Sequence, residues 1–352
     1  MTGLIILGTR PEALKLIPII KKALDNRFSI VIVSTDQHEE AITHIFEKHN
    51  LKLDYRLKRT QVSSLGEQIA SYLAQLSTLF HKKSFDFVIT QGDTLSAYAG
   101  MLFAFFKQID FLYVESGLRT LDLDNPFPEE GLRVMMSHIA KMNFVPTQSE
   151  KDNLEKENIA SNKIMIVGNT SIDYLMGHMP KKQKVKNGQT ILLTVHRREN
   201  WHFLEAFFTR LVNFAQNNPH ISIEYPMHFN PTIQKLAKEV LSESSNIHLY
   251  EPLEIQDFYQ HLLNADLIVT DSGGVQEEAT FLNKKVIVIR DKTERIFTDE
   301  NIQIMSITES SLFDEASAML HKSFFTDSFN TIYGDGHAST RIIDWIKKEY
   351  ER

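Results

Sequence analysis

The sequence predicts an α/β protein made of two Rossmann-like, doubly wound domains, and three observations lead to this prediction. Short apolar runs alternate with helix-length amphipathic segments along the chain. Most of these runs are unbroken by polar residues, as in strands that are buried on both faces of a parallel sheet. The chain has 352 residues, of which 42% are hydrophobic, and this is enough to fill two cores.

The first half of the chain contains six strand candidates. They run from Leu4 to Leu7, Ile30 to Val33, Phe85 to Ile89, Phe111 to Val114, Phe144 to Val145 and Ile164 to Val167. Residues 11–24 carry apolar side chains at helical spacing, which predicts the helix of a first βαβ unit. We assign residues 1–176 to an N-terminal domain that carries the catalytic carboxylates discussed below.

A polar, lysine-rich segment interrupts the alternation between Met176 and Gln189, and we expect the linker there. Five further strand candidates predict a second doubly wound domain over residues 189–337: Ile191 to Val195, Ile221 to Tyr225, Ile247 to Tyr250, Leu267 to Thr270 and Val286 to Ile289. The final segment, residues 338–352, is a helix candidate whose apolar side chains need a surface to cover. It could cross back to the first domain.

The composition excludes several classes of protein. The net charge is −7 and the basic residues are scattered, so no face predicts a nucleic acid partner. The absence of cysteine excludes disulfides and thiolate metal sites, and it fits a reducing compartment. The apolar run at the N-terminus is too short for a signal peptide or a membrane span. We expect a soluble, cytoplasmic protein that does not insert into membranes.

Parallel α/β sheets bind ligands at the carboxyl ends of their strands, so the loops after the apolar runs are the candidate sites. In the first loop, GTRPE at 8–12, Pro11 suits the first position of a helix. Arg10 and Lys15 can then face a phosphate or carboxylate, although a tight turn with a solvated arginine is an equal alternative. The loop is not GxGxxG, so it does not support the usual dinucleotide site.

Three carboxylates follow later strand candidates of the first half, namely Asp93, Glu115 and Glu129. If they converge, each raises the pKa of the others, which supplies a protonated acid and an ionised base for proton transfer. The alternative is structural, with an aspartate at a helix N-terminus and glutamates paired with Arg119 or Arg133.

The second half offers two candidate loops. His196 ends a strand candidate, where it could hydrogen-bond a sugar or move a proton, although a single histidine is more often structural. The segment DSGGVQEEA at 271–279 places glycines at a helix N-terminus, a natural seat for a diphosphate. One turn later, Glu278 could accept hydrogen bonds from ribose hydroxyls, unless this is a glycine-rich turn with solvated glutamates. Phe258 could stack on a base, but an aromatic at that spacing is more often part of a core.

Six segments, in order, resemble the non-hydrolysing UDP-N-acetylglucosamine 2-epimerases: GTRPEALK at 8–15, QGDT at 91–94, VESGLRT at 114–120, PFPEEGLR at 126–133, HRREN at 196–200 and DSGGVQEEA at 271–279. RDKTER at 290–295 and YGDGHAS at 333–339 also resemble segments of that family, so the resemblance covers nearly the whole chain. It implies two domains of the glycosyltransferase-B type, with the active site in the cleft between them.

The resemblance also implies roles for individual residues. Catalysis would involve Asp93, Glu115, Glu129 and His196. Substrate binding would involve Arg10, Lys15, Arg133, His228, Phe258, Ser272, Gly273, Gly274, Glu278 and Arg295. In this set Phe258 contacts the uracil, residues 272–274 hold the diphosphate and Glu278 accepts the ribose hydroxyls.

Members of the family invert C2 of UDP-N-acetylglucosamine to give UDP-N-acetylmannosamine without NAD or a metal ion, so no cofactor is implied. They eliminate UDP to leave 2-acetamidoglucal, and they add UDP back after C2 is protonated on its opposite face. The sequence leaves open which carboxylate is the base, and we expect Asp93 and Glu115 to be most sensitive to substitution. The resemblance further implies a homodimer, and the product would supply an envelope or capsule polysaccharide.

The chain departs from the family at several positions. Tyr113 and Gln91 each stand where many members have histidine, and tyrosine cannot carry a proton near neutral pH as histidine can. Bacterial members often bind a second UDP-N-acetylglucosamine as an activator through the segment that corresponds to Gln37 and His38. Glu39 replaces a cation there, a change that works against this allosteric site.

Four other functions remain open at this point. An epimerase of another UDP-acetamido sugar would keep the fold and change the pocket. A hydrolysing 2-epimerase would release free N-acetylmannosamine and UDP. A glycosyltransferase of the same architecture would need an acceptor-binding surface on the first domain, where the carboxylates favour elimination instead. A catalytically idle nucleotide-sugar sensor is disfavoured, because all three carboxylates are present.

Overall fold

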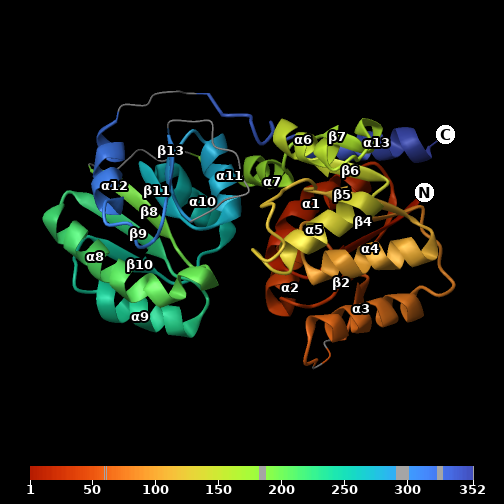
Figure 1. Ribbon diagram of the computed structural model, residues 1–352, viewed down its shortest axis with the longest axis horizontal. Helices are drawn as coiled ribbons and strands as arrows, with labels where there is room; N and C mark the ends of the chain where they lie inside the picture. The colour runs from red at the N-terminus through yellow and green to blue at the C-terminus, as the bar shows by residue number, and fades with distance from the viewer. Residues whose placement is uncertain (59, 61, 182–187, 291–300, 323–327, 352) are drawn as a thin grey trace. The chain divides into compact units, whose positions relative to one another are not determined.

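The computed structural model describes residues 1–351 except 59, 61, 182–187, 291–300 and 323–327 (Figure 1). The chain divides into two compact units. The first combines Met1–Tyr174 with Ile332–Arg352, and the second is formed by Leu175–Thr331.

The first unit is built on a seven-stranded parallel sheet with the order β3-β2-β1-β4-β5-β6-β7. Its strands are β1 (Thr2–Leu7), β2 (Ser29–Ser34), β3 (Tyr55–Arg56), β4 (Phe87–Gln91), β5 (Asp110–Val114), β6 (Met142–Val145) and β7 (Ile164–Ile166). The central strands β1, β4 and β5 are almost wholly buried, as their unbroken apolar runs predict.

Helices lie on both faces of this sheet. They are α1 (Arg10–Asp25), α2 (Glu39–Lys48), α3 (Leu65–Leu79), α4 (Leu95–Lys107), α5 (Glu129–Ile139), α6 (Gln148–Lys156) and α13 (Ala338–Tyr350), with a short 3-10 turn η1 (Ser161–Lys163). Buried side chains of α3, α4 and α5 form one core with Leu4 and Ile6 of β1. Side chains alternate between the faces of a strand, so Ile5 and Leu7 point to the opposite side.

The second unit repeats this plan with a six-stranded parallel sheet in the order β10-β9-β8-β11-β12-β13. Its strands are β8 (Gln189–Thr194), β9 (Ile221–Pro226), β10 (Ile247–Tyr250), β11 (Leu267–Thr270), β12 (Lys285–Ile289) and β13 (Ile302–Met305). Its helices are α8 (Leu204–Asn217), α9 (Pro231–Leu241), α10 (Ile255–Asn264), α11 (Gly273–Phe281) and α12 (Leu312–His321), with the 3-10 helix η2 (Arg198–Phe203) before α8.

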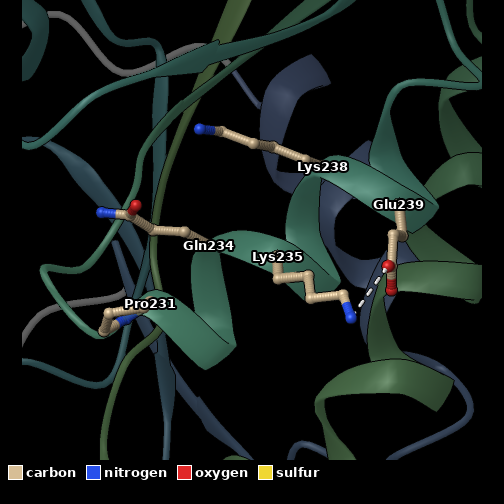
Figure 2. Close-up of a pocket in the computed structure, with 5 residues that line it drawn as sticks. All are labelled: Pro231, Gln234, Lys235, Lys238 and Glu239. Atoms are coloured by element: carbon tan, nitrogen blue, oxygen red, sulfur yellow. Dashed lines mark ion pairs between the residues drawn. The ribbon is translucent and has the colours of Figure 1, made fainter.

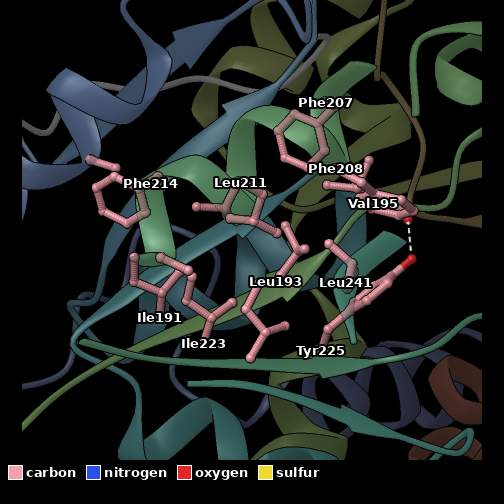
Figure 3. Packing of buried hydrophobic residues seen from close by; sticks show 14 of the residues in the cluster. Ile191, Leu193, Val195, Phe207, Phe208, Leu211, Phe214, Ile223, Tyr225 and Leu241 are labelled. Atoms are coloured by element: carbon pink, nitrogen blue, oxygen red, sulfur yellow. Dashed lines mark hydrogen bonds between the residues drawn. The ribbon is translucent and has the colours of Figure 1, made fainter. Parts of the chain in front are cut away.

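The core of the second unit joins strands β8 and β9 to α8 (Figure 3). Leu193 and Ile223 face Phe207 and Phe208 of the helix, and all four side chains are at most 1% exposed. The hydroxyl of Tyr225 is satisfied inside this core, because it donates a 3.1 Å hydrogen bond to the carbonyl of Val195.

The C-terminal segment returns to the first unit, where α13 packs against α1. Ile342, Ile343 and Ile346 of α13 are buried, and burial of each such side chain stabilises the fold by roughly 1.5–3 kcal/mol. The Trp345 ring meets Phe144 of β6 edge to face at 5.5 Å. The apolar side chains of this helix therefore cover a surface of the N-terminal unit.

The structure confirms the predicted fold class and the strand candidates of both halves. The sequence does not predict β3 and β13, because β3 has only two residues, both exposed, and β13 is a four-residue run that Gln303 interrupts. The division between the units falls at Tyr174 and Leu175, before the polar segment at 176–189. Helix α7 (Thr170–His178) carries the chain across this point.

Candidate functional site

Each sheet reverses its strand order at one place, between β1 and β4 in the first unit and between β8 and β11 in the second. Open parallel sheets bind ligands at the carboxyl ends of the strands beside such a switch point. Most of the predicted site residues lie in the loops and helix starts after β1, β4 and β5 and after β8, β9 and β11, whereas Gln37 and His38 follow β2 and Phe258 lies in α10.

The loop after β1 is held by Glu12, a buried carboxylate to which the sequence assigns no role. Thr9 caps α1 and forms a capping box with Glu12, whose Oε2 accepts from the N–H groups of Gly8 and Thr9 at 3.0 and 2.7 Å. Its Oε1 accepts from Thr94 Oγ1 in the loop after β4. Burial raises the pKa of Glu12 to about 7, although these hydrogen bonds oppose the shift. The pattern Thr-x-x-Glu is the sequence signal for this network.

The predicted phosphate ligands on α1 have different surroundings. The Arg10 side chain is half-buried, and its backbone N–H donates to Nδ1 of His38 at 3.3 Å. Lys15 instead forms an ion pair with Glu115, with Nζ 2.5 Å from Oε1. In this structure the Lys15 ammonium therefore faces a catalytic candidate.

Glu115 is the most enclosed of the three predicted carboxylates, with 7% exposure. Its Oε1 accepts from Lys15 and, at 3.0 Å, from Asn169 Nδ2, while its Oε2 accepts from Gln91 Nε2. Its backbone has a φ of 63°, in the left-handed region that costs a non-glycine residue free energy. Such strain clusters at functional sites, and at least three donors contact this carboxylate.

Asp93 is more open and lies beside a buried arginine. Arg133 Nη1 donates to Asp93 Oδ2 at 2.8 Å, and the same guanidinium donates through Nε and Nη2 to Glu130 Oε2. Glu130 also accepts from the backbone N–H groups of Thr120 and Leu121, so it ties the loop after β5 to α5. Arg133, predicted as a substrate ligand, is 3% exposed and orients Asp93 in this structure.

Glu129 begins α5 and differs from the other two carboxylates. Its Oε2 atom is buried and has no hydrogen-bond partner among the described residues. Arg119 is not its partner, because Arg119 donates through Nε and Nη2 to Glu157 at 2.7 and 2.8 Å. The structural alternative expected these arginines to pair with the candidate glutamates, whereas Arg119 pairs with Glu157 and Arg133 pairs with Asp93 and Glu130.

Tyr113, at the position where the family often has histidine, points into the core of the first unit. Its hydroxyl is fully buried without a hydrogen-bond partner among the described residues. Burial, and then the charge of Asp93, raise the pKa of Tyr113 above its ordinary value. The hydroxyl therefore stays un-ionised at physiological pH.

In the second unit, Asp271 organises the loop that contains His196. This carboxylate is fully buried and accepts from the backbone N–H groups of His196 and Arg197 and from Asn200 Nδ2 at 2.9 Å. The His196 ring stacks on that of His228 at 5.2 Å between centroids. Burial, and then His196, lower the pKa of His228. Asn230 N–H donates to His228 Nδ1, so the neutral ring carries its proton on Nε2.

The predicted diphosphate seat lies at the start of α11. Ser272 makes no side-chain capping hydrogen bond, and a Cβ at Gly274 would meet no atom of the described residues within 4 Å. Glu278 Oε1 accepts from the hydroxyl of buried Tyr259 at 3.1 Å. Phe258 is only half-buried, because its neighbour Tyr259 takes the core position. Gly273 lies in the same turn, and Arg295 lies outside the described residues.

The predicted allosteric residues Gln37 and His38 are exposed and precede α2. Burial of part of the ring, and then Arg10, lower the pKa of His38, whose Nδ1 accepts from the Arg10 N–H. His38 therefore adjoins the first candidate loop.

An open depression lies against α9 and does not include any predicted site residue (Figure 2). It is lined by Pro231, Gln234, Lys235, Lys238 and Glu239. Its lysines are already paired with carboxylates, Lys235 with Glu239 at 3.7 Å and Lys238 with Glu251 at 2.8 Å. Across the described part of the chain, no group of three or more histidine, aspartate or glutamate side chains is placed to hold a metal ion. None of the described helices is long and apolar enough to span a bilayer.

Comparisons with known proteins agree with this arrangement. Residues 22–347 match the family model described as UDP-N-acetylglucosamine 2-epimerase. The chain is 36% identical to the UDP-N-acetylglucosamine 2-epimerase of Bacillus subtilis, over 98% of this chain and 94% of that protein. The crystal structure of the Neisseria meningitidis enzyme bound to UDP-GlcNAc superposes with a TM-score of 0.87 at 32% identity, and covers 99% of this chain and all of that one.

A third relative is the enzyme of Methanocaldococcus jannaschii in complex with UDP-GlcNAc and UDP. It superposes with a TM-score of 0.84 at 32% identity and covers 99% of this chain and all of that one. These matches confirm the predicted glycosyltransferase-B type of fold.

Proposed function

The chain belongs to the UDP-N-acetylglucosamine 2-epimerase family, and we propose that it interconverts UDP-N-acetylglucosamine and UDP-N-acetylmannosamine. The observation that carries this proposal is the family match over residues 22–347. The carboxylates that the reaction needs follow neighbouring strands, since β4 pairs with β5 and Gln91 lies beside Val114. The enzyme is then an isomerase that leaves the UDP-sugar intact overall.

The reaction proceeds by elimination and re-addition of UDP. A base removes the proton from C2 while the bond between C1 and the diphosphate oxygen breaks, which leaves 2-acetamidoglucal and UDP. Protonation of C2 from the opposite face, with return of the UDP oxygen to C1, gives the epimer. The C2 proton is weakly acidic, so the base must be held in place and the charge of the departing UDP must be stabilised.

The surroundings of the three carboxylates support a division of roles. Glu115, held by Lys15, Gln91 and Asn169, suits a fixed negative charge that orders the site. Asp93, one third exposed and paired with Arg133, and Glu129, one oxygen of which has no partner in the described part of the chain, suit proton transfer on the two faces of C2. Either of these two can be the base in the forward direction.

The second unit binds the UDP part of the substrate in this proposal. The open N-terminus of α11 at residues 272–274 receives the diphosphate, and Glu278 accepts the ribose hydroxyls. Phe258 stacks on the uracil, and His196 and His228 donate to the leaving UDP. A neutral His228 with its proton on Nε2 fits such a donor.

We further propose a cytoplasmic homodimer whose product feeds an envelope or capsule polysaccharide. The absence of cysteine fits a reducing compartment. Light scattering on the purified protein tests the dimer, and a monomer at micromolar concentration contradicts it. Activation by a second UDP-N-acetylglucosamine through Gln37 and His38 is expected to be weak, because Glu39 adds negative charge.

One experiment tests the main proposal and its alternatives together. The purified protein is incubated with UDP-N-acetylglucosamine in D2O without NAD or added metal, and the sugar is followed by proton NMR. Deuterium at C2 of a UDP-linked manno sugar is the expected result. Free N-acetylmannosamine indicates a hydrolysing enzyme instead, and an unchanged substrate directs the search to other UDP-acetamido sugars or to a glycosyl acceptor.

A further inference from the structure

We propose that Asn169 is a positioning residue that holds the Glu115 carboxylate and ties it to the C-terminal segment of the chain. The inference rests on the proposed function only for its kinetic consequence, because the contacts themselves lie within the first unit. The sequence offers no signal for it, since Asn169 follows a short edge strand and is 54 residues from Glu115.

The Asn169 side chain has one possible orientation in this environment. It is 2% exposed, and its Oδ1 accepts a 3.0 Å hydrogen bond from the backbone N–H of Ser171. Because that atom accepts, the Nδ2 group must be the one that faces Glu115, and it donates to Oε1 at 3.0 Å. A donor fixed in this way favours the ionised form of the carboxylate.

The Asn169 backbone is fixed by the returning C-terminal segment. Its N–H donates to the carbonyl of Tyr333 at 2.7 Å. Next to it, Gly168 and Gly334 both have positive φ, and a Cβ on Gly168 would lie 2.9 Å from Cα of Gly334. Neither position has room for a side chain, so the two backbones touch.

Further hydrogen bonds hold the same two segments together. Arg341 Nη1 donates to the carbonyl of Val167 at 3.0 Å and also pairs with Asp335. Asp173 accepts from the backbone N–H groups of Ala338 and Ser339, and from the Ser339 hydroxyl at 2.6 Å. The segment before α13 and the start of that helix therefore hold residues 167–173 in place. Asn169 belongs to this held segment, and its hydrogen bond fixes the position of the Glu115 carboxylate.

The charged groups around Glu115 define what a change at Asn169 should do. Lys15 from α1 is the direct ionic partner of Glu115. The charges of Glu115, Asp93, Arg119 and Arg133 all affect the pKa of Tyr113, so they belong to one cluster. In Asn169→Asp a second carboxylate replaces the donor at about 3 Å, and two such groups cannot both ionise easily. Asn169→Ala removes this donor without adding a charge, and it also removes the acceptor of the Ser171 N–H.

The test is a titration of Glu115 in protein labelled with 13C at the glutamate carboxyl carbons. The Glu115 signal is the one missing from Glu115→Gln. We expect its midpoint to rise by about one pH unit or more in Asn169→Asp, and by less in Asn169→Ala. Ser339→Ala removes one hydrogen bond of the same junction and contacts neither Asn169 nor Glu115, so it is the matched control and should shift the midpoint by less than either Asn169 variant.

Kinetics with UDP-N-acetylglucosamine provide the second readout. Both Asn169 variants should lower kcat by about 10- to 100-fold with a smaller change in KM, and the acid limb of kcat should move with the Glu115 midpoint. An unchanged Glu115 midpoint in both variants, or an equal shift in Ser339→Ala, overturns the inference. If the wild-type protein does not turn over this substrate, the proposed function fails, and the titration still decides the role of Asn169.

Discussion

Glu12 accepts a 2.6 Å hydrogen bond from the hydroxyl of Thr94, so a single buried carboxylate joins the loops that follow β1 and β4. Arg10 and Lys15 follow the first of these loops, and Asp93 lies in the second. The site of the first unit is therefore assembled around a group whose pKa, near 7, lies close to physiological pH.

The stability of the protein should depend on pH through Glu12. Its folded pKa is raised from 4.5 to about 7, so its contribution is fully present below pH 4.5 and is lost as the pH rises through 7. The loss amounts to about 3 kcal/mol. Glu12→Gln keeps an oxygen that accepts from the Thr9 N–H, replaces the oxygen that accepts from Thr94 by an amide that can donate to it, and removes the titration. Urea unfolding at about pH 5 and pH 8 should show a smaller fall in stability for Glu12→Gln than for wild type; equal falls contradict the assignment.

Asp93→Asn should lower the rate of epimerisation by about 10²- to 10⁴-fold, because an amide cannot take up the C2 proton. The amide oxygen still accepts from Arg133, so the thermal midpoint and the affinity for UDP should change little. Deuterium incorporation at C2 in D2O measures the rate. Retention of more than a tenth of the wild-type rate would show that Asp93 is not the group that moves the proton.

Tyr113→Phe should stabilise the protein by about 1 kcal/mol, because it removes a buried hydroxyl that none of the described residues satisfies. The ring packing against Phe111 is kept. Differential scanning calorimetry checks the shift, and kcat should remain within about twofold of wild type. A clear loss of stability would mean that the hydroxyl makes a hydrogen bond in solution.

Asp271→Ala should destabilise the second unit by about 3 kcal/mol or more, because it leaves the donors of His196, Arg197 and Asn200 buried without their acceptor. The affinity for UDP should fall together with stability. Asp271→Asn is the milder control, since it retains one oxygen. Thermal unfolding and calorimetric titration with UDP measure the two effects. If Asp271→Ala binds UDP as tightly as wild type, the loop that contains His196 does not contribute to UDP binding.

The sequence predicts the strands and the loops that carry Asp93 and Glu115 well, because Glu115 directly follows an apolar run and Asp93 lies four residues after the one that ends at Ile89. It does not predict the partners of the charged side chains. Arg119 pairs with Glu157 and Arg133 with Asp93, and only the packing of helices on the sheet makes these choices. The sequence does not predict the role of Asn169 for a related reason. Its contact with Glu115 depends on the order of strands in the sheet and not on local spacing.

Because residues 332–351 complete the first unit, the N-terminal unit is discontinuous in the chain, whereas the second unit is a continuous insertion. During translation, all of Leu175–Thr331 is therefore synthesised before α13, the helix that completes the core of the first unit. The second unit can fold during synthesis, and the first must wait for Ile342, Ile343 and Ile346. Premature termination after Thr331 would not trim a dispensable tail; it would leave the N-terminal unit with an open apolar surface that recruits chaperones.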